Sequence, residues 1–158
     1  SKRSLSTVVA TLLLVLLVVV AIGIVNQFII PMIKKNLRSA GSCFDALGEI
    51  QLNNKYTCYD QNNNKVNVSI EVKKIKVDGF VVNIYGGGNA ESLTIKEENI
   101  DSRITMSGSL NIILPKENEA RTYEITTGIS DPETITISPM VGSETCEKSD
   151  QTILTKCP

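Results

Sequence analysis

The stretch SKRSLSTVVATLLLVLLVVVAIGIVNQFIIPMIKK, residues 1–35, places two basic residues before a long run without any charge. Residues 4–33 contain no charged side chain, and the next charge along the chain is Lys34. As an α-helix, these 30 residues would extend about 45 Å, which exceeds the ~30 Å hydrocarbon core of a bilayer. The sequence therefore predicts a hydrophobic α-helix long enough to span a membrane.

The uncharged run is apolar on every side of the predicted helix rather than along one stripe, so it requires apolar surroundings in all directions, either lipid or similar helices. It is also much longer than the ~7–15 apolar residues of a cleaved secretory signal, so we expect it to stay in the mature protein. The residues expected to pack in these surroundings are Leu5, Val8, Val9, Leu12, Leu16, Val19, Ile22 and Phe28.

Pro31 interrupts the backbone hydrogen bonds of the predicted helix, because proline has no amide hydrogen to donate to the Gln27 carbonyl. We expect a kink or a local opening between Gln27 and Pro31, with Asn26 and Gln27 at the polar end of the run. Residues 32–42, MIKKNLRSAGS, are then expected to continue as an amphipathic helix that ends at Gly41.

Charge is distributed unevenly along the 158 residues. The first 40 residues carry five basic side chains and no acidic one, whereas the remainder carries 11 of the 16 basic and all 17 acidic residues, a net charge of −6. With few aromatic residues as well, this remainder lacks the basic, stacking surface that binds nucleic acid. The chain contains no histidine, the commonest general base and transition-metal ligand, so we expect neither an enzyme nor a bound metal or cofactor.

Four cysteines, Cys43, Cys58, Cys146 and Cys157, all follow the apolar run. An even number without the close CxxC pairs of a zinc site favours two disulfides in an oxidising compartment, with four reduced and buried thiols as the alternative. We predict the pairs Cys43–Cys58 and Cys146–Cys157, because pairing of neighbouring cysteines closes short loops at the two ends of the domain.

Beyond Cys43 the pattern changes from helix to strand. In KVNVSIEV, residues 65–72, apolar and polar side chains alternate as in a half-buried strand. The alternation then shifts by one residue, which predicts a bulge near Lys73 and Lys74. Asp78-Gly79 lies between two alternating runs and predicts a two-residue hairpin turn. Further strands are predicted for SLTIKE, SLNIILP, RTYEITT and ETITISPMV, residues 92–97, 109–115, 121–127 and 133–141.

Short strands separated by turn residues at intervals of about 8–12 residues are typical of antiparallel sandwiches rather than of α/β domains. The expected fold class is therefore α+β, with a long N-terminal hydrophobic α-helix followed by an all-β, immunoglobulin-like antiparallel sandwich. We expect the helix to occupy residues 1–42 and the single β-sandwich domain to occupy residues 43–158.

Three short motifs in the β region are candidates for phosphate binding, calcium binding and glycosylation. The glycine run at residues 86–88 lacks the lysine and the helix that follow a phosphate-binding loop, which favours a flexible hairpin loop. Glu97, Glu98 and Asp101 lack the alternating ligand spacing of a dedicated calcium site, which favours a solvated turn. Asn67 opens NVS, the one Asn-x-Ser/Thr sequon, and is the candidate N-glycosylation site, with chance occurrence as the alternative.

The N-terminal residues KRSLSTVVATLLLVLLVVVAIGIV, 2–25, resemble the class III signal peptide and helix of archaeal type IV pilins, members of the archaeal pilin and archaellin superfamily. In that family a basic pair and a small residue precede the apolar stretch, and a prepilin peptidase cuts after the small residue on the cytoplasmic side. The resemblance implies that Lys2 and Arg3 form the basic pair, that Ser4 is the small residue and that Leu5 becomes the first residue after cleavage.

The resemblance implies a structural subunit, the major pilin of an extracellular archaeal type IV pilus-like filament that serves adhesion or contact with a host or another surface. The precursor would be inserted in the membrane. On assembly by the pilus machinery, the helix would leave the lipid and pack against identical helices in the core of a homopolymer. The β-domain would stay outside the cell, in agreement with the cysteines and the sequon.

Two alternatives stay open. Archaellin, the subunit of the rotary motility filament, is built on the same kind of helix. A membrane-anchored surface binding module would instead keep its helix in lipid and capture a ligand with its β-domain. For all three, we expect no catalytic residue, no cofactor and no nucleic-acid partner.

Overall fold

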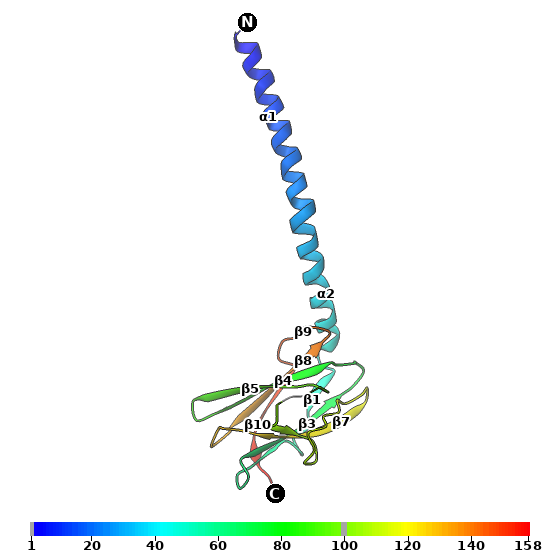
Figure 1. Ribbon diagram of the computed structural model, residues 1–158, viewed down its shortest axis with the longest axis vertical. Helices are drawn as coiled ribbons and strands as arrows, with labels where there is room; N and C mark the ends of the chain where they lie inside the picture. The colour runs from blue at the N-terminus through cyan, green and yellow to red at the C-terminus, as the bar shows by residue number, and fades with distance from the viewer. Residues whose placement is uncertain (1, 99–100) are drawn as a thin grey trace. The chain divides into compact units, whose positions relative to one another are not determined.

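The computed structural model describes the backbone of residues 2–98 and 101–158, and the side chains of these residues other than 2–7, 34–40 and 42. The chain divides into two compact units, residues 1–41 and 42–158. The fold class is α+β, because one N-terminal apolar helix precedes a region of β-strands arranged in two sheets (Figure 1). Residues 42–158 are called the β-domain below.

The helical region consists of three consecutive elements, α1 (Lys2–Ile24), the π-helical turn η1 (Val25–Ile29) and α2 (Ile30–Ala46). The prediction that the helix ends at Gly41 is wrong, because α2 continues to Ala46. The last turn of α2 belongs to the β-domain, where Ala46 is buried in the core and Cys43 forms a disulfide. These contacts offset the cost of about 1 kcal/mol that a glycine imposes within a helix.

The β-domain contains both short and long strands. They are β1 (Ile50–Leu52), β2 (Cys58–Asp60), β3 (Lys65–Val72), β4 (Gly79–Gly86), β5 (Asn89–Ile95), β6 (Ile104–Thr105), β7 (Glu119–Thr126), β8 (Thr134–Val141), β9 (Glu144–Thr145), β10 (Asp150–Ile153) and β11 (Thr155–Lys156).

The strands form two sheets that share one hydrophobic core (Figure 1). The first sheet has the order β11-β2-β3-β7-β6, and β1 also pairs with β3. The second has the order β10-β8-β4-β5, and β9 also pairs with β8. The strand pairs are antiparallel except for β11 with β2. The predicted β-sandwich is therefore confirmed.

Strand β3 is the central strand of the first sheet, paired along its whole length with β7. The apolar residues of the alternating pattern that predicted β3 are those that point inward and have no exposed surface: Val66, Val68, Ile70 and Val72. Opposite them, β4 contributes Phe80, Val82 and Ile84, which are also fully buried. Burial of a side chain of this size stabilises the fold by about 1.5–3 kcal/mol, so these two strands supply much of the core.

Two predictions for the connection between β3 and β4 are wrong. Strand β3 pairs with β7, whereas β4 pairs with β5 and β8, so Asp78-Gly79 joins two different sheets and is not a hairpin turn. The shift of alternation at Lys73 marks the end of β3 rather than a bulge. Gly79 is required for close packing, because an added Cβ would lie 2.7 Å from the Ile95 carbonyl oxygen.

A two-residue hairpin turn does occur, at Gly87-Gly88 between β4 and β5. The φ angles of these glycines are 56° and 77°, in the left-handed region that a type I′ turn requires at both central positions. The glycine run at residues 86–88 thus forms a hairpin loop, as predicted.

Gly86 leaves no space for a side chain, because an added Cβ would lie 2.0 Å from the Asp131 carbonyl oxygen. Gly86→Ala is therefore expected to lower the free energy of unfolding by about 3 kcal/mol, since backbone must move to relieve the overlap. The matched control is Gly128→Ala, whose Cβ would meet no atom within 4 Å. Urea unfolding in detergent can be followed by tyrosine fluorescence, because all four tyrosines lie in the β-domain. Wild-type stability of Gly86→Ala would contradict this packing.

The predicted strand at residues 109–115, SLNIILP, is wrong, because this segment is irregular. Its apolar residues Ile112 and Leu114 are nevertheless buried in the core. The Tyr123 hydroxyl donates a hydrogen bond to the Ile113 carbonyl oxygen at 2.8 Å and so holds the segment against β7. Burial raises the pKa of Tyr123 above its ordinary value, so the hydroxyl keeps the proton that it donates.

Side-chain hydrogen bonds connect the two sheets where β1 lies near β10. The carboxylate of Asp150 accepts a hydrogen bond from the Leu52 N–H at 2.8 Å. The Ser149 hydroxyl donates to the Ile50 carbonyl oxygen at 2.9 Å. These bonds satisfy backbone groups of the short strand β1 that strand pairing with β3 leaves open.

Glu91 of β5 connects the sheets at another edge. Its carboxylate accepts hydrogen bonds from the Thr127 hydroxyl at 2.8 Å and from the Gly128 N–H at 3.1 Å, and it forms an ion pair with Arg103. Glu91→Ala is expected to lower the free energy of unfolding by about 2 kcal/mol, because it leaves these donors unpaired. The same urea unfolding measurement checks this value. Ser92→Ala, at an exposed position of the same strand, is the control that should remain within about 0.5 kcal/mol of the wild-type chain.

Two disulfides are present, but the predicted pairs are wrong. Cys43 is bonded to Cys146 and Cys58 to Cys157, with Cα–Cα distances of 5.3 Å and 5.0 Å. The first joins the last turn of α2 to the segment that follows β9. The second joins neighbouring strands, because β11 runs parallel to β2 and places Cys157 beside Cys58. Each pair is close in space and about 100 residues apart in the chain, with separations of 103 and 99.

Candidate functional site

An uncharged and mainly apolar surface covers the helix from Val8 to Ile33, which we call the apolar span. The span has 26 residues, none of which is buried within the chain, and an 18-residue window of it has a mean hydropathy of 3.3. A bilayer requires about 20 apolar residues, so the span is long enough to cross one with residues to spare. The same length and composition also suit burial among other apolar helices.

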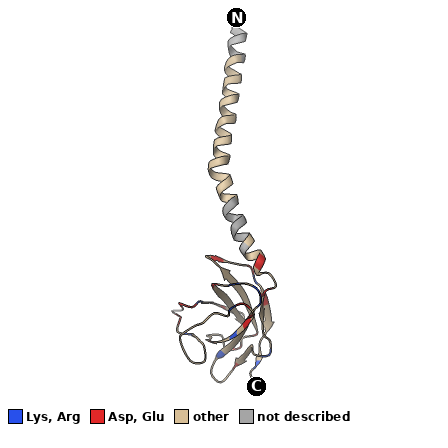
Figure 2. Ribbon diagram, turned by 90° about the vertical axis from the view of Figure 1, so that its right-hand side faces the viewer, with Lys and Arg blue, Asp and Glu red and all other residues tan. Residues whose placement is uncertain are grey.

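Exposure extends around the whole helix. Figure 2 shows neither acidic nor basic residues along the apolar span, in contrast to the β-domain. The predicted packing residues within the span are between 51% and 68% exposed: Val8, Val9, Leu12, Leu16, Val19, Ile22 and Phe28. Leu13, Leu14 and Leu17, which the sequence analysis did not single out, are as exposed as these. No stripe of the span is therefore covered by the chain's own residues.

The predicted opening near Pro31 coincides with the π-helical turn η1. At its end the Ile30 N–H donates to the Val25 carbonyl, five residues earlier, instead of four as in an α-helix. Asn26 and Gln27 lie within this turn, and both side chains are exposed. The turn is thus the place where polar groups interrupt the apolar surface.

The predicted cleavage site lies in a described part of the backbone, because Ser4 and Leu5 belong to α1. Their side chains lie outside the described residues. Cleavage between them stays a prediction.

Asn67, the candidate glycosylation site, lies on the central strand β3 and is half-buried. Its Nδ2 is 3.9 Å from Cys58 Sγ and 3.7 Å from Cys157 Sγ. A glycan is attached through this nitrogen, so its addition to the folded domain would require the side chain to turn away from the disulfide. Glycosylation of Asn67 stays a prediction.

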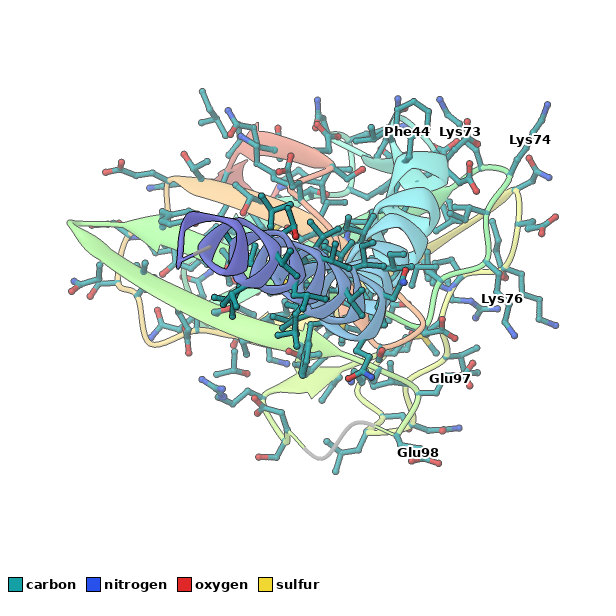
Figure 3. The ribbon with its side chains drawn as sticks, turned by 90° about the horizontal axis from the view of Figure 1, so that it is seen from above. Phe44, Lys73, Lys74, Lys76, Glu97 and Glu98 are labelled. Atoms are coloured by element: carbon teal, nitrogen blue, oxygen red, sulfur yellow. A yellow bond between two sulfur atoms is a disulfide. The ribbon has the colours of Figure 1, made fainter. Side chains whose placement is uncertain are left out.

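Two open depressions on the β-domain are lined mainly by charged side chains. One is lined by Asp45, Glu49, Lys74, Ile75, Lys76 and Val141, and the other by Lys76, Val77, Asp78, Lys96, Glu97, Glu98 and Leu114. Figure 3 shows the labelled lysines and glutamates of these segments directed outward from the domain. Across residues 2–98 and 101–158, no three His, Cys, Asp or Glu side chains come together as a metal site. These depressions therefore give no basis for a specific ligand.

The β-domain thus offers a folded, disulfide-bonded body, whereas the apolar span offers an uncovered surface. No known family model and no curated protein sequence matches the chain. A function must therefore be argued from the physical chemistry of the span. The span requires either lipid or other apolar helices around it, because water contact with so large an apolar surface is unfavourable.

Proposed function

We propose that this chain is the subunit of an extracellular filament of the archaeal type IV pilus kind. In this proposal the span is inserted in the membrane before assembly and forms the filament core afterwards. Copies of the chain are then the principal partner, and a prepilin peptidase and the assembly machinery act on the precursor. Adhesion or contact with a surface is the role that we propose for the filament.

The observation that carries the proposal is the uncovered apolar surface of the span. It is uncharged, exposed on every side and six residues longer than the ~20 that a bilayer requires. Lipid can cover such a helix in the monomer, and identical neighbouring helices can cover it in a polymer. A polymer covers the whole length, including the part beyond a bilayer's thickness, without tilting the helix.

The β-domain supports an extracellular location for the second unit. Its core is formed by its own strands, and both of its disulfides are closed within it. Disulfides persist in oxidising surroundings such as the cell exterior. A body of this kind can remain folded while its helix exchanges lipid for neighbouring helices.

Electron microscopy of material sheared from cells that express the chain tests the proposal directly. We expect filaments that an antibody against the β-domain decorates along their length. We also expect them to sediment after detergent has dissolved the membrane. Complete solubilisation of the chain by detergent, with no filament, would favour a membrane-anchored module instead. Swimming that depends on this chain after deletion of all other filament genes would favour an archaellin.

A further inference from the structure

The π-helical turn leaves a backbone carbonyl group without a helical donor inside the apolar span. The Ile30 N–H donates to the Val25 carbonyl, so it is not available to the Asn26 carbonyl, its usual acceptor in an α-helix. Pro31, the next residue, has no N–H. The Asn26 carbonyl therefore lacks a π-helical donor as well, and the Gln27 carbonyl lacks its α-helical donor. This turn thus has an open acceptor at residue 26, whereas the Gln27 carbonyl still has a π-helical donor within reach, the Met32 N–H five residues later.

Donors that fit this acceptor lie on the same turn. The exposed side-chain amides of Asn26 and Gln27 each carry two N–H donors. Neither amide forms a hydrogen bond with any other described residue of the chain. Thr11, the polar residue near the start of the span, differs in this respect. Its hydroxyl donates to the Val8 carbonyl oxygen at 2.8 Å, so its hydrogen is already bonded within the helix.

A second copy of this chain can supply both the hydrogen-bond donor for the open carbonyl and an acceptor for the free side-chain amides. One turn carries both an open acceptor and free donors, so two parallel copies are complementary at the same height. In a dry bundle of apolar helices, each unpaired polar group carries a substantial free-energy cost, and hydrogen bonds between helices remove it. A displacement of about one helical turn, ~5.4 Å, leaves the groups within reach of the flexible Gln27 side chain.

We infer that residues 26 and 27 form a polar contact between neighbouring copies, in which a side-chain amide N–H of one copy donates to an open carbonyl of the other. The inference rests on the proposed filament, in which identical helices surround the span. It adds a specific polar contact to a core that otherwise offers only apolar packing. The contact aligns neighbouring subunits along the filament axis, because apolar side chains alone permit sliding.

The test first removes the side-chain amide donors of Asn26 and Gln27, and then restores a backbone N–H that can bond the open carbonyl within the helix. Asn26→Leu/Gln27→Leu keeps side chains of similar size but leaves the Asn26 carbonyl group open and buried. We expect the ratio of sheared filament to membrane-bound subunit to fall at least about fivefold. Adding Pro31→Ala to this variant supplies the missing N–H and lets the turn close as an α-helix. We expect this triple variant to return to within about twofold of the wild-type ratio, because neither free donors nor open acceptors remain.

Thr11→Val is the matched control, because it also removes a polar group from the span but one that is bonded within the helix. Its ratio is expected to equal that of the wild-type chain. A wild-type ratio for Asn26→Leu/Gln27→Leu, or no recovery on adding Pro31→Ala, would overturn the inference while wild-type filaments still support the proposed function. If the wild-type chain forms no filament, the proposed function itself fails.

Discussion

Replacing Val18 by aspartate is expected to abolish filament assembly while membrane-bound subunit remains detectable. Val18 lies near the middle of the apolar span and is exposed in the single chain. In a bilayer, a central carboxylate costs about 2.5–3.5 kcal/mol by insertion scales, because the side chain can reach toward the surface and draw in water. A packed helical core allows neither adjustment, so the cost is larger there and recurs in every subunit.

The measurement is the ratio of sheared filament to membrane-bound subunit, determined by immunoblot. Val18→Ile is the matched control, since it keeps an apolar, β-branched side chain and adds one methylene group. It should assemble like the wild-type chain, because a swap of this kind costs less than about 1.5 kcal/mol. Normal filaments from Val18→Asp would show that this helix does not form the filament core.

Removal of the Cys58–Cys157 disulfide is expected to lower the stability of the β-domain strongly. The bond closes a loop with a sequence separation of 99, and a loop of this length corresponds to about 4.7 kcal/mol in the chain-entropy account. Small domains have a total free energy of unfolding of about 5–15 kcal/mol. Cys58→Ala/Cys157→Ala should therefore lose a large fraction of its stability and have a strongly lowered urea midpoint.

Cys43→Ala/Cys146→Ala provides a matched comparison, because its loop has nearly the same separation, 103. Its loss of stability should be similar if both bonds act by restricting the unfolded chain. Urea unfolding followed by tyrosine fluorescence measures both variants, and peptide mapping without reduction checks the pairing. A loss below about 1 kcal/mol for either variant would contradict this account.

A strand could be predicted where its apolar side chains are buried on one face of a sheet, because such burial produces the alternating pattern. Residues 65–72 alternate because one face of β3 is covered by the second sheet, so periodicity alone locates the strand. The segment at 109–115 shows the limit of this argument. Its apolar residues are buried, but the backbone is held by the Tyr123 hydroxyl rather than by a neighbouring strand. Periodicity reports burial and does not distinguish these two arrangements.

Hairpin turns were predicted at two places, and only one of the two is correct. Asp78-Gly79 has the composition of a hairpin turn, yet the chain crosses there from one sheet to the other. Gly87-Gly88 forms the hairpin. The difference arises because glycine serves two purposes, positive φ at the hairpin and close packing at Gly79. Only the neighbouring strands determine which purpose applies.

The open Asn26 carbonyl within the apolar span is a second feature that the sequence alone did not predict. Pro31 alone predicts a disturbance and one missing donor, at the Gln27 carbonyl. The structure adds that the Ile30 N–H moves to the Val25 carbonyl, which also leaves the Asn26 carbonyl without its partner. A shift of hydrogen bonds along a helix depends on the backbone geometry and has no signature in composition.

Local patterns in the sequence were sufficient for the apolar helix, the β-sandwich and the presence of two disulfides. Each follows from side-chain chemistry over short distances: an uncharged run of 30 residues, alternation within strands and an even number of cysteines. The partners of the cysteines and of the strands depended on the tertiary structure. Cys58 meets Cys157 because β11 adds to the first sheet beside β2, almost 100 residues after it. Such contacts result from packing the two sheets around one core, which brings together residues that are distant in the chain and share no local pattern.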